Sequence, residues 1–248
     1  MATHLPETVA STASSGMRDR LIVALDVSSA GEAQRLVQRI GEAAGIYKVG
    51  LQLFTAEGPG LVRDLVTSGR RIFLDLKLHD IPNTVGHAVK AAAELGVHML
   101  SVHASGGAAM LRAATEASAG RVNLLAVTVL TSLSDDDLHE IGVPGQVAGQ
   151  ALRMAALARS AGCQGVVSSP RELLPLRKLL GENFAIVTPG IRPAGAAAHD
   201  QQRTATPAQA IGNGASHIVV GRPITHAPDP VQAAQAIICE MEQAKISR

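Results

Sequence analysis

Asp75, Lys77 and Asp80 lie within one largely apolar segment, Arg71 to Thr84, and their types and spacing could support chemistry. Asp75 and Lys77 are two residues apart on a predicted strand, so both side chains should point to the same face. Asp80 follows where that strand gives way to a loop. Because an unpaired charge is costly to bury, we expect the three to converge at the carboxyl end of the strand. An ordinary ion pair is the structural alternative to a set that stabilises or transfers charge during a reaction.

Polar residues also follow other predicted strands, at the end where α/β proteins bind ligands. They are Asp26 after the first strand, Lys48 on the second, His103 on the fourth, Thr131 and Ser132 after the fifth, Gly190 and Arg192 after the seventh, and Gly221 and Arg222 after the eighth. Two lysines interleaved with two aspartates, plus Asp80, could form a network in which every charge contacts an opposite one. A purely structural fold would not need this concentration of charge.

The ends of the last two strands have the composition of a phosphate site. Thr188-Pro189-Gly190-Ile191-Arg192 and Val219-Val220-Gly221-Arg222 each combine a glycine with an arginine. Glycine lets the backbone approach an anion, and arginine offers a planar set of donors to phosphate oxygens. Each segment alone is more typical of a tight turn with a solvated arginine. Their pairing on adjacent strands favours phosphate binding.

The elements that must position these residues recur as one unit, a short apolar run followed by a polar residue or glycine and an alanine-rich helical pattern. The predicted strands are Leu21 to Asp26, Tyr47 to Leu51, Ile72 to Lys77, Met99 to His103, Leu124 to Leu130, Gly165 to Ser168, Ala185 to Thr188 and His217 to Val220. The predicted helices are Ser28 to Ile40, which starts at a serine cap and can end at Gly41, Ala88 to Leu95, Val147 to Ala161 and Val231 to Ala244.

Eight alternating units without a change of composition predict the α/β class, as a single (β/α)8 TIM barrel over residues 18–248. The alternative is a doubly wound open sheet, which would place a glycine-rich turn after its first strand. Here that strand runs into Asp26-Val27-Ser28-Ser29, so the barrel is favoured. Residues 1–17 are rich in Thr, Ser and Ala and lack the apolar core of a signal peptide, so we predict a disordered N-terminal extension.

Composition narrows the classes of function. Aromatic residues make up 2% of the 248 residues, too few for an RNA-stacking surface, and the net charge of +1 gives no sign of a nucleic acid partner. No apolar run approaches the ~20 residues of a membrane span. Cys163 and Cys239 lie far apart and outside any metal-type spacing, which predicts a reduced, cytoplasmic protein.

The segment Asp75-x-Lys77-x-x-Asp80-Ile81-Pro82-x-Thr84 resembles the signature of the orotidine 5′-phosphate decarboxylase family, with Leu78-His79 and Asn83 as in its bacterial form. The resemblance extends over about residues 20 to 230. It implies that the ribose is contacted by Asp26 and Lys48, the pyrimidine by Thr131 and Ser132, and the phosphate by Arg192, Gln201, Gly221 and Arg222. Gln201 is aligned in preference to Gln202 because it directly follows Asp200.

The resemblance also implies a reaction, the loss of CO₂ from C6 of orotidine 5′-phosphate to give uridine 5′-phosphate, with no cofactor and no metal. Lys77 would stabilise the carbanion and then protonate it, while Asp75 would lie beside the substrate carboxylate. Lys48 and Asp80 would hold Lys77 charged and aimed. The family is expected to act as a homodimer, in which Asp80 and Thr84 reach into the neighbouring subunit's site.

Other barrels that bind sugar phosphates remain as alternatives. The metal-dependent 3-hexulose-6-phosphate synthase and 3-keto-gulonate-6-phosphate decarboxylase types share an Asp-x-Lys-x-x-Asp strand, but their carboxylates hold magnesium, and a metal gains nothing from Lys48. In a ribulose-phosphate epimerase type, His103 could be a metal ligand, but His98 should face the other way. A Schiff-base aldolase needs a neutral amine, whereas Lys48 and Lys77 beside carboxylates should keep their protons. A nucleotide-binding barrel without activity would gain little from buried carboxylates.

Overall fold

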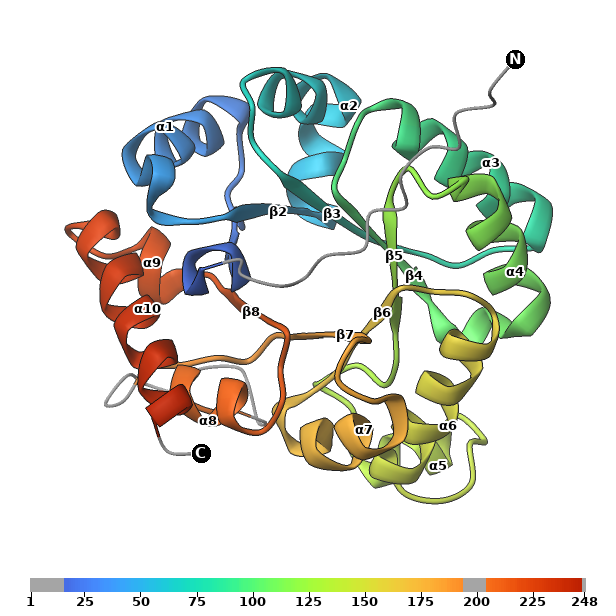
Figure 1. The fold of residues 1–248 in the computed structure, drawn as a ribbon. Coiled ribbons are helices and arrows are strands. Elements are labelled where there is room, and N and C mark those ends of the chain that lie inside the picture. The colour runs from blue at the N-terminus through green and yellow to red at the C-terminus, as the bar shows by residue number, and fades with distance from the viewer. Residues whose placement is uncertain (1–15, 194–203, 247–248) are drawn as a thin grey trace, which may run out of the picture.

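Each strand of the chain pairs in parallel with its neighbours in sequence, and the last strand pairs with the first, so the sheet closes on itself. The computed structural model describes residues 16–193 and 204–246. In Figure 1 the helices form a ring around this closed sheet. The predicted (β/α)8 TIM barrel is therefore confirmed.

All eight predicted strands are present. They are β1 (Leu21–Ala24), β2 (Ile46–Gly50), β3 (Ile72–Leu78), β4 (Met99–His103), β5 (Asn123–Val127), β6 (Gly165–Val167), β7 (Ala185–Thr188) and β8 (His217–Val220). The prediction ran past the ends of β1 and β5 because the buried residues Leu25 and Val129 extend the apolar pattern beyond the last paired position. It stopped one residue short of the end of β3.

Each strand is followed by at least one helix, and two helices follow the last strand. The helices are α1 (Ala30–Ile40), α2 (Leu51–Thr67), α3 (Pro82–Glu94), α4 (Gly107–Ser118), α5 (Asp135–Glu140), α6 (Val147–Ser160), α7 (Leu173–Leu180), α8 (Pro207–Gly212), α9 (Arg222–Thr225) and α10 (Pro230–Ile246). Short 3-10 helices precede or follow several of them, namely η1 (Met17–Arg20), η2 (Gly41–Ala43), η3 (Ala104–Gly106) and η4 (Pro170–Glu172).

The helix ends show which local signals were read correctly. A serine caps α1, but it is Ser29, whose hydroxyl accepts a hydrogen bond from the backbone N–H of Glu32 at 3.4 Å. Gly41 ends the helix with a φ of 54°, as predicted. The predicted start of α3 at Ala88 is wrong, because Pro82 begins the helix at its first position, where proline is favoured.

Apolar side chains fill both the barrel interior and the space between strands and helices. The interior cluster consists of Ile22, Ala24, Ile46, Phe73, Met99, Leu125, Val187 and Val219. Apart from Phe73 and Tyr47, the largest fully buried side chains in the described part of the chain are not aromatic. The interior is thus a packed core that supports the residues at the carboxyl ends of the strands.

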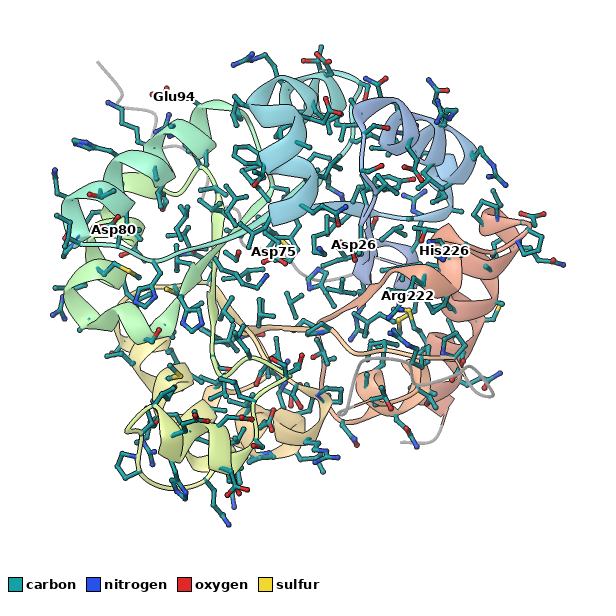
Figure 2. All side chains as sticks on the ribbon, turned by 180° about the vertical axis from the view of Figure 1, so that it is seen from behind. Asp26, Asp75, Asp80, Glu94, Arg222 and His226 are labelled. Carbon is teal, nitrogen blue, oxygen red and sulfur yellow. The ribbon has the colours of Figure 1, made fainter. Side chains whose placement is uncertain are left out.

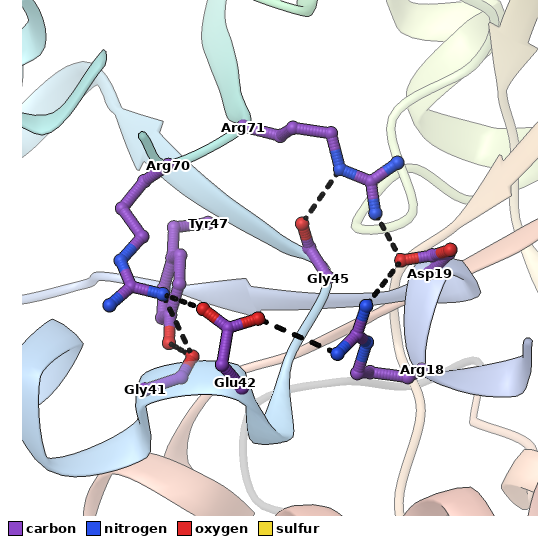
Figure 3. Close-up of polar contacts among 8 residues, drawn as sticks. All are labelled: Arg18, Asp19, Gly41, Glu42, Gly45, Tyr47, Arg70 and Arg71. Atoms are coloured by element: carbon purple, nitrogen blue, oxygen red, sulfur yellow. Dashed lines mark hydrogen bonds and ion pairs between the residues drawn. The ribbon is translucent and has the colours of Figure 1, made fainter. Parts of the chain in front are cut away.

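A network of ion pairs and carbonyl contacts closes the amino end of the barrel (Figure 3). Arg70 donates to the Glu42 carboxylate at 2.8 Å and to the Gly41 carbonyl at 3.3 Å. Arg71 contacts the Asp19 carboxylate and also donates to a backbone carbonyl. These arginines are held by structural contacts that join η1, η2 and the start of β3.

The beginning of the described chain differs from the prediction in one respect. Residues 1–15 lie outside the described residues, so a disordered extension remains a prediction there. Met17, which the prediction assigned to the extension, is the first residue of η1 and is buried. Within residues 16–193 and 204–246, no helix is both long and apolar enough to cross a membrane.

Candidate active site

Asp75 and Lys77 form an ion pair on β3, with Lys77 Nζ 2.9 Å from Asp75 Oδ2. The strand is not regular at this point. Its register against β4 shifts between Leu74 and Leu78, and Lys77 has a φ of 52°, in the left-handed region that L-residues rarely adopt. Such an irregularity re-aims a side chain locally. The pair predicted from alternation is therefore present, but on a backbone that alternation does not describe.

Lys48 on β2 extends this pair into a chain of alternating charges. Its Nζ lies 3.1 Å from Asp26 Oδ1 and 3.8 Å from Asp75 Oδ2. The side chains of Lys48 and Asp75 are each 12% exposed, whereas that of Asp26 is 61% exposed. A Cβ at Gly50 would lie 2.9 Å from the Lys48 amine, so glycine leaves room for it. The structure thus brings Asp26, Lys48, Asp75 and Lys77 together in alternating order.

Ser101 on β4 completes the surroundings of the pair and was missed in the sequence. Its hydroxyl donates to Asp75 Oδ1 at 2.8 Å and accepts a hydrogen bond from the Lys77 backbone N–H at 2.8 Å. Ser101 is fully buried. A signal was present, since Ser101 and His103 occupy alternate positions of one strand and a buried polar residue needs partners.

A cavity of about 440 Å³ opens above the barrel core, within the size range of small-molecule sites. Eight of the predicted site residues line it, namely Asp26, Lys48, Asp75, Lys77, Thr131, Arg192, Gly221 and Arg222. Its remaining lining is largely apolar and includes Phe73 and Val219 of the interior cluster. The cavity therefore combines an apolar floor with a charged rim.

The loops after β7 and β8 contribute the cationic side of the cavity. Gly190 has a φ of 80°, which glycine adopts without strain. Backbone hydrogen bonds with Ala205 hold the loop, with Arg192 N–H donating to the Ala205 carbonyl at 3.0 Å. Arg222 opens α9, and His226 follows that helix and also lines the cavity. Figure 2 shows Arg222 and His226 close together on this side. Sequence reasoning gave no role to His226.

Three predicted site residues do not line the cavity of this chain, and a fourth lies outside the described residues. Ser132 and Thr84 are exposed, and Gln201 is the one that is not described. Asp80 is exposed, and its carboxylate accepts a hydrogen bond from the Ile81 backbone N–H at 2.6 Å. Figure 2 places Asp80 near α3, well away from Asp75. Convergence of Asp80 with Asp75 and Lys77 within one chain is therefore wrong, because β3 has ended and the chain turns outward into α3.

The histidines are arranged differently from a metal centre. His103 stacks on His79, with ring centroids 5.4 Å apart. Burial lowers the pKa of His103, and the nearby His79 and Lys77 lower it further. His98 precedes β4 near Arg71, at the amino end, so the two histidines belong to opposite ends of the barrel. In the described ranges, no three His, Cys, Asp or Glu side chains are grouped so as to hold a metal ion.

Fold and site together define a class, the (β/α)8 barrel proteins whose ligand cavity lies at the carboxyl ends of the strands, here lined by alternating lysines and aspartates. The model of the orotidine 5′-phosphate decarboxylase / HUMPS family matches residues 19–237. The chain belongs to this family. The predicted resemblance is confirmed, and so is the prediction that the chain is an enzyme.

Relatives share the sequence over nearly their full length. The orotidine 5′-phosphate decarboxylase of Moorella thermoacetica is 52% identical over 237 residues, covering 92% of this chain and 94% of that protein. That of Heliobacterium modesticaldum is 48% identical over 240 residues, covering 93% and 99%. A crystal structure of orotidine 5′-phosphate decarboxylase from Lactobacillus acidophilus aligns with a TM-score of 0.81 at 41% identity, covering 89% of this chain and 98% of that one.

Proposed function

We propose that this chain converts orotidine 5′-phosphate to uridine 5′-phosphate and CO₂, as the last step of de novo pyrimidine nucleotide synthesis in the cytoplasm. The observation that carries the proposal is the alternating chain of Asp26, Lys48, Asp75 and Lys77 in a cavity with a cationic rim. Relatives named for this activity share about half of the residues across the whole barrel.

The substrate would lie across the cavity with its phosphate at Gly221, Arg192 and Arg222. Its ribose would contact Asp26 and Lys48, which leaves the pyrimidine at the Asp75 and Lys77 end of the network. Thr131 lines the cavity on the side of β5, as a contact to the ring requires. Contacts from Ser132 and Gln201 are further parts of the proposal, taken from the family resemblance.

The chemistry demands an environment that stabilises negative charge. When the bond between C6 and the carboxyl carbon breaks, its electron pair remains on C6 in an orbital of the ring plane and cannot delocalise into the ring. The Lys77 ammonium group would face this carbon, stabilise the developing charge and then donate a proton from Nζ to form the new C–H bond. Asp75 would lie beside the substrate carboxylate, where repulsion is relieved as neutral CO₂ leaves.

One lysine does not account for a large rate enhancement. A single preorganised donor contributes about 3–4 kcal/mol to transition-state stabilisation. The remainder must come from the rest of the network and from binding energy at groups that do not react. The phosphate side of the cavity is therefore part of catalysis in this proposal.

Lys48 separates this function from that of metal-dependent barrels with a similar β3. Its amine lies between the carboxylates of Asp26 and Asp75, where it occupies the position that a divalent cation would need. The proposal accordingly includes neither metal nor cofactor.

The proposed active unit is a homodimer in which Asp80 and Thr84 complete the neighbouring site. Both residues are exposed on the surface of one chain, and Ile81 beside them is 65% exposed. Asp80 and Thr84 are therefore accessible to a second copy of the chain.

The direct test is to incubate the purified protein with orotidine 5′-phosphate in the presence of a chelator and without added cofactor. Loss of the substrate's ultraviolet absorbance, with release of CO₂, is the expected result. The Lys77→Ala variant serves as the inactive control. Activity that the chelator abolishes, and that magnesium restores, would instead assign the chain to the metal-dependent type.

A further inference from the structure

Two imidazole rings meet just outside the cavity. His79 lies one residue beyond the end of β3, and His103 is the last residue of β4. Their ring centroids are 5.4 Å apart and their planes differ by 21°, within the range of attractive stacked aromatic pairs. His79 is exposed, whereas His103 is half-buried. The half-buried His103 ring therefore provides the fixed surface on which the exposed His79 ring packs.

The His103 side chain is held in place by Ser105, and its backbone belongs to the sheet. The Ser105 hydroxyl lies 2.6 Å from His103 Nδ1, and the Ser105 backbone N–H donates to the same nitrogen at 3.4 Å. His103 is in register with Val127 of β5, so its backbone belongs to the closed sheet. On the other side, a Cβ at Gly106 would lie 3.2 Å from the His79 ring, so this ring packs against the glycine.

His79 directly precedes Asp80 in the sequence. After Asp80 comes Ile81, and α3 begins at Pro82, with the Ile81 carbonyl accepting from the Val85 backbone N–H at 3.2 Å. Asp80 therefore lies between the stacked ring on one side and a proline-initiated helix on the other. Between these constraints, Asp80 and Ile81 are the connecting residues.

We propose that the His79–His103 stack is a positioning device that fixes the backbone of Asp80, so that its carboxylate is presented to the active site of the neighbouring subunit. The inference rests on the proposed function and its homodimer. It gives the two histidines a role in the partner's site, although both lie beside their own Lys77. They are positioning residues and contact no reacting atom.

The stack has a rival explanation, in which it acts on Lys77 of the same chain. Lys77 is close enough to His103 to lower its pKa, and both lie on adjacent strands. The two explanations differ in which subunit's active site loses activity when the stack is removed. Loss of a device for Asp80 impairs the neighbouring site, while loss of a contact to Lys77 impairs the site of the same chain.

The first experiment compares ring removal with ring replacement in the homodimer. Because His79 is exposed, His79→Ala should fold normally, and a misplaced carboxylate should lower kcat by about 10- to 100-fold with a smaller change in KM. His79→Phe keeps a flat ring on His103 and should stay within about threefold of wild type. His103→Ala should reproduce the defect of His79→Ala. His139→Ala, in an exposed side chain of α5 outside the cavity lining, is the matched control.

The second experiment uses mixed dimers purified through two different tags. One subunit carries His79→Ala and the other carries Lys77→Ala. The site with an intact lysine then receives Asp80 from a subunit with an intact stack, so the hybrid should have about half of the wild-type activity, from one of two sites. With both substitutions in one subunit and a wild-type partner, the site with an intact lysine receives the mispositioned Asp80 and should be as impaired as the His79→Ala homodimer.

The possible results distinguish a failure of the positioning role from a failure of the proposed dimeric decarboxylase. A wild-type protein inactive on orotidine 5′-phosphate, or active as a monomer in sedimentation, would overturn both the proposed dimeric enzyme and this role. An active dimer whose defect stays with the subunit that carries His79→Ala would overturn the positioning role alone. Equal loss in the alanine and phenylalanine variants would also contradict it, since the ring would then be irrelevant.

Discussion

Lys77 occupies a backbone conformation that costs an L-residue roughly 1–2 kcal/mol, and Ser101 is the side chain that holds it there. The same hydroxyl fixes Asp75, so one buried serine orients both members of the ion pair. Strain of this kind persists only where the surroundings over-determine it. At the scale of single residues, the position of the Lys77 amine, the proton donor of the proposed mechanism, therefore depends on a buried group outside the cavity lining.

Replacing Ser101 should show this dependence. Ser101→Ala leaves a carboxylate oxygen and a backbone N–H without this partner, so we expect a loss of about 1–3 kcal/mol in the free energy of unfolding. The lysine should also be aimed less well, so kcat should fall about tenfold or more with a smaller change in KM. Urea denaturation and steady-state kinetics measure the two effects, and Ser101→Thr, which keeps the hydroxyl, should recover most of the activity. A normal kcat in the alanine variant would contradict this view of Lys77.

Lys77 itself has the sharpest expected effect. In the proposed mechanism, Lys77→Ala removes both the cation that stabilises the carbanion and its proton donor, so decarboxylation should fall by far more than the ~10²–10³ of one hydrogen-bond donor. Circular dichroism should still report a folded barrel. Lys178→Ala, in an exposed lysine of α7, should keep wild-type rates. Near-normal turnover of Lys77→Ala would show that the mechanism is wrong.

Arg222 tests whether phosphate binding contributes to catalysis. It follows β8, which β1 and β2 separate from β3 in the closed sheet, so Arg222→Ala leaves the proposed reacting end of the cavity unchanged. Charged hydrogen bonds of about 1.5–3 kcal/mol each predict a loss of roughly 10- to 100-fold or more in kcat/KM. Arg153→Ala, in an exposed residue of α6, is the control. A trivial loss in Arg222→Ala would place the phosphate elsewhere.

The elements themselves were largely predictable, because buried parallel strands are apolar runs of a length that helices rarely match. Their ends were less so. At Asp26 and Leu130 the composition does not reveal where the pairing with the next strand stops, since hydrogen bonding to a neighbour decides it. The predicted helix from Ala88 to Leu95 leaves out Pro82, although proline is well suited to the first turn of a helix.

In the candidate site, too, some residues could be predicted from the sequence and others could not. Asp75, Lys77 and Lys48 could be found because charges in apolar strands require an explanation. The signal for Ser101, a polar residue at an alternate position to His103 on a buried strand, shows that it needs a partner but does not identify Asp75 as that partner. The left-handed backbone of Lys77 has no sequence signal. The contact between His79 and His103 depends on the register of two strands, which sequence periodicity leaves open.

The start of β8 provides a prediction about pH. The pKa of His217 is lowered to about 4, chiefly by burial and then by the neighbouring charges of Arg20, His98 and Arg71, against an opposing effect of Asp19. Its Nδ1 is buried without a hydrogen-bond partner among the described residues. The neutral form therefore stabilises the folded barrel above the unfolded pKa of 6.5, and this stability is lost as pH falls towards 4.

The expected loss is on the order of 3 kcal/mol in the free energy of unfolding between these pH values. Denaturant unfolding at several pH values measures it. His217→Asn should flatten the acid dependence even if it lowers stability at neutral pH, whereas His139→Ala, in an exposed histidine, should keep the wild-type slope. An unchanged slope in His217→Asn would assign the acid sensitivity to other groups.

At the scale of the whole molecule, the proposal requires two chains for one complete site. Asp80 is exposed and outside the cavity of its own chain, so a dissociated subunit would lack a member of the network. Specific activity should therefore fall on dilution, in parallel with the dimer fraction measured by sedimentation velocity. Constant specific activity across the dissociation range would show that one chain suffices.

The two ends of the barrel differ in their features. The cavity lies at the carboxyl ends of the strands, and the arginine network lies at their amino ends. A solid support or a polymer coupled to the arginine face would leave the mouth open to dissolved nucleotide. An immobilised preparation oriented in this way should keep the substrate affinity of the free protein, whereas coupling through the opposite face would obstruct diffusion into it.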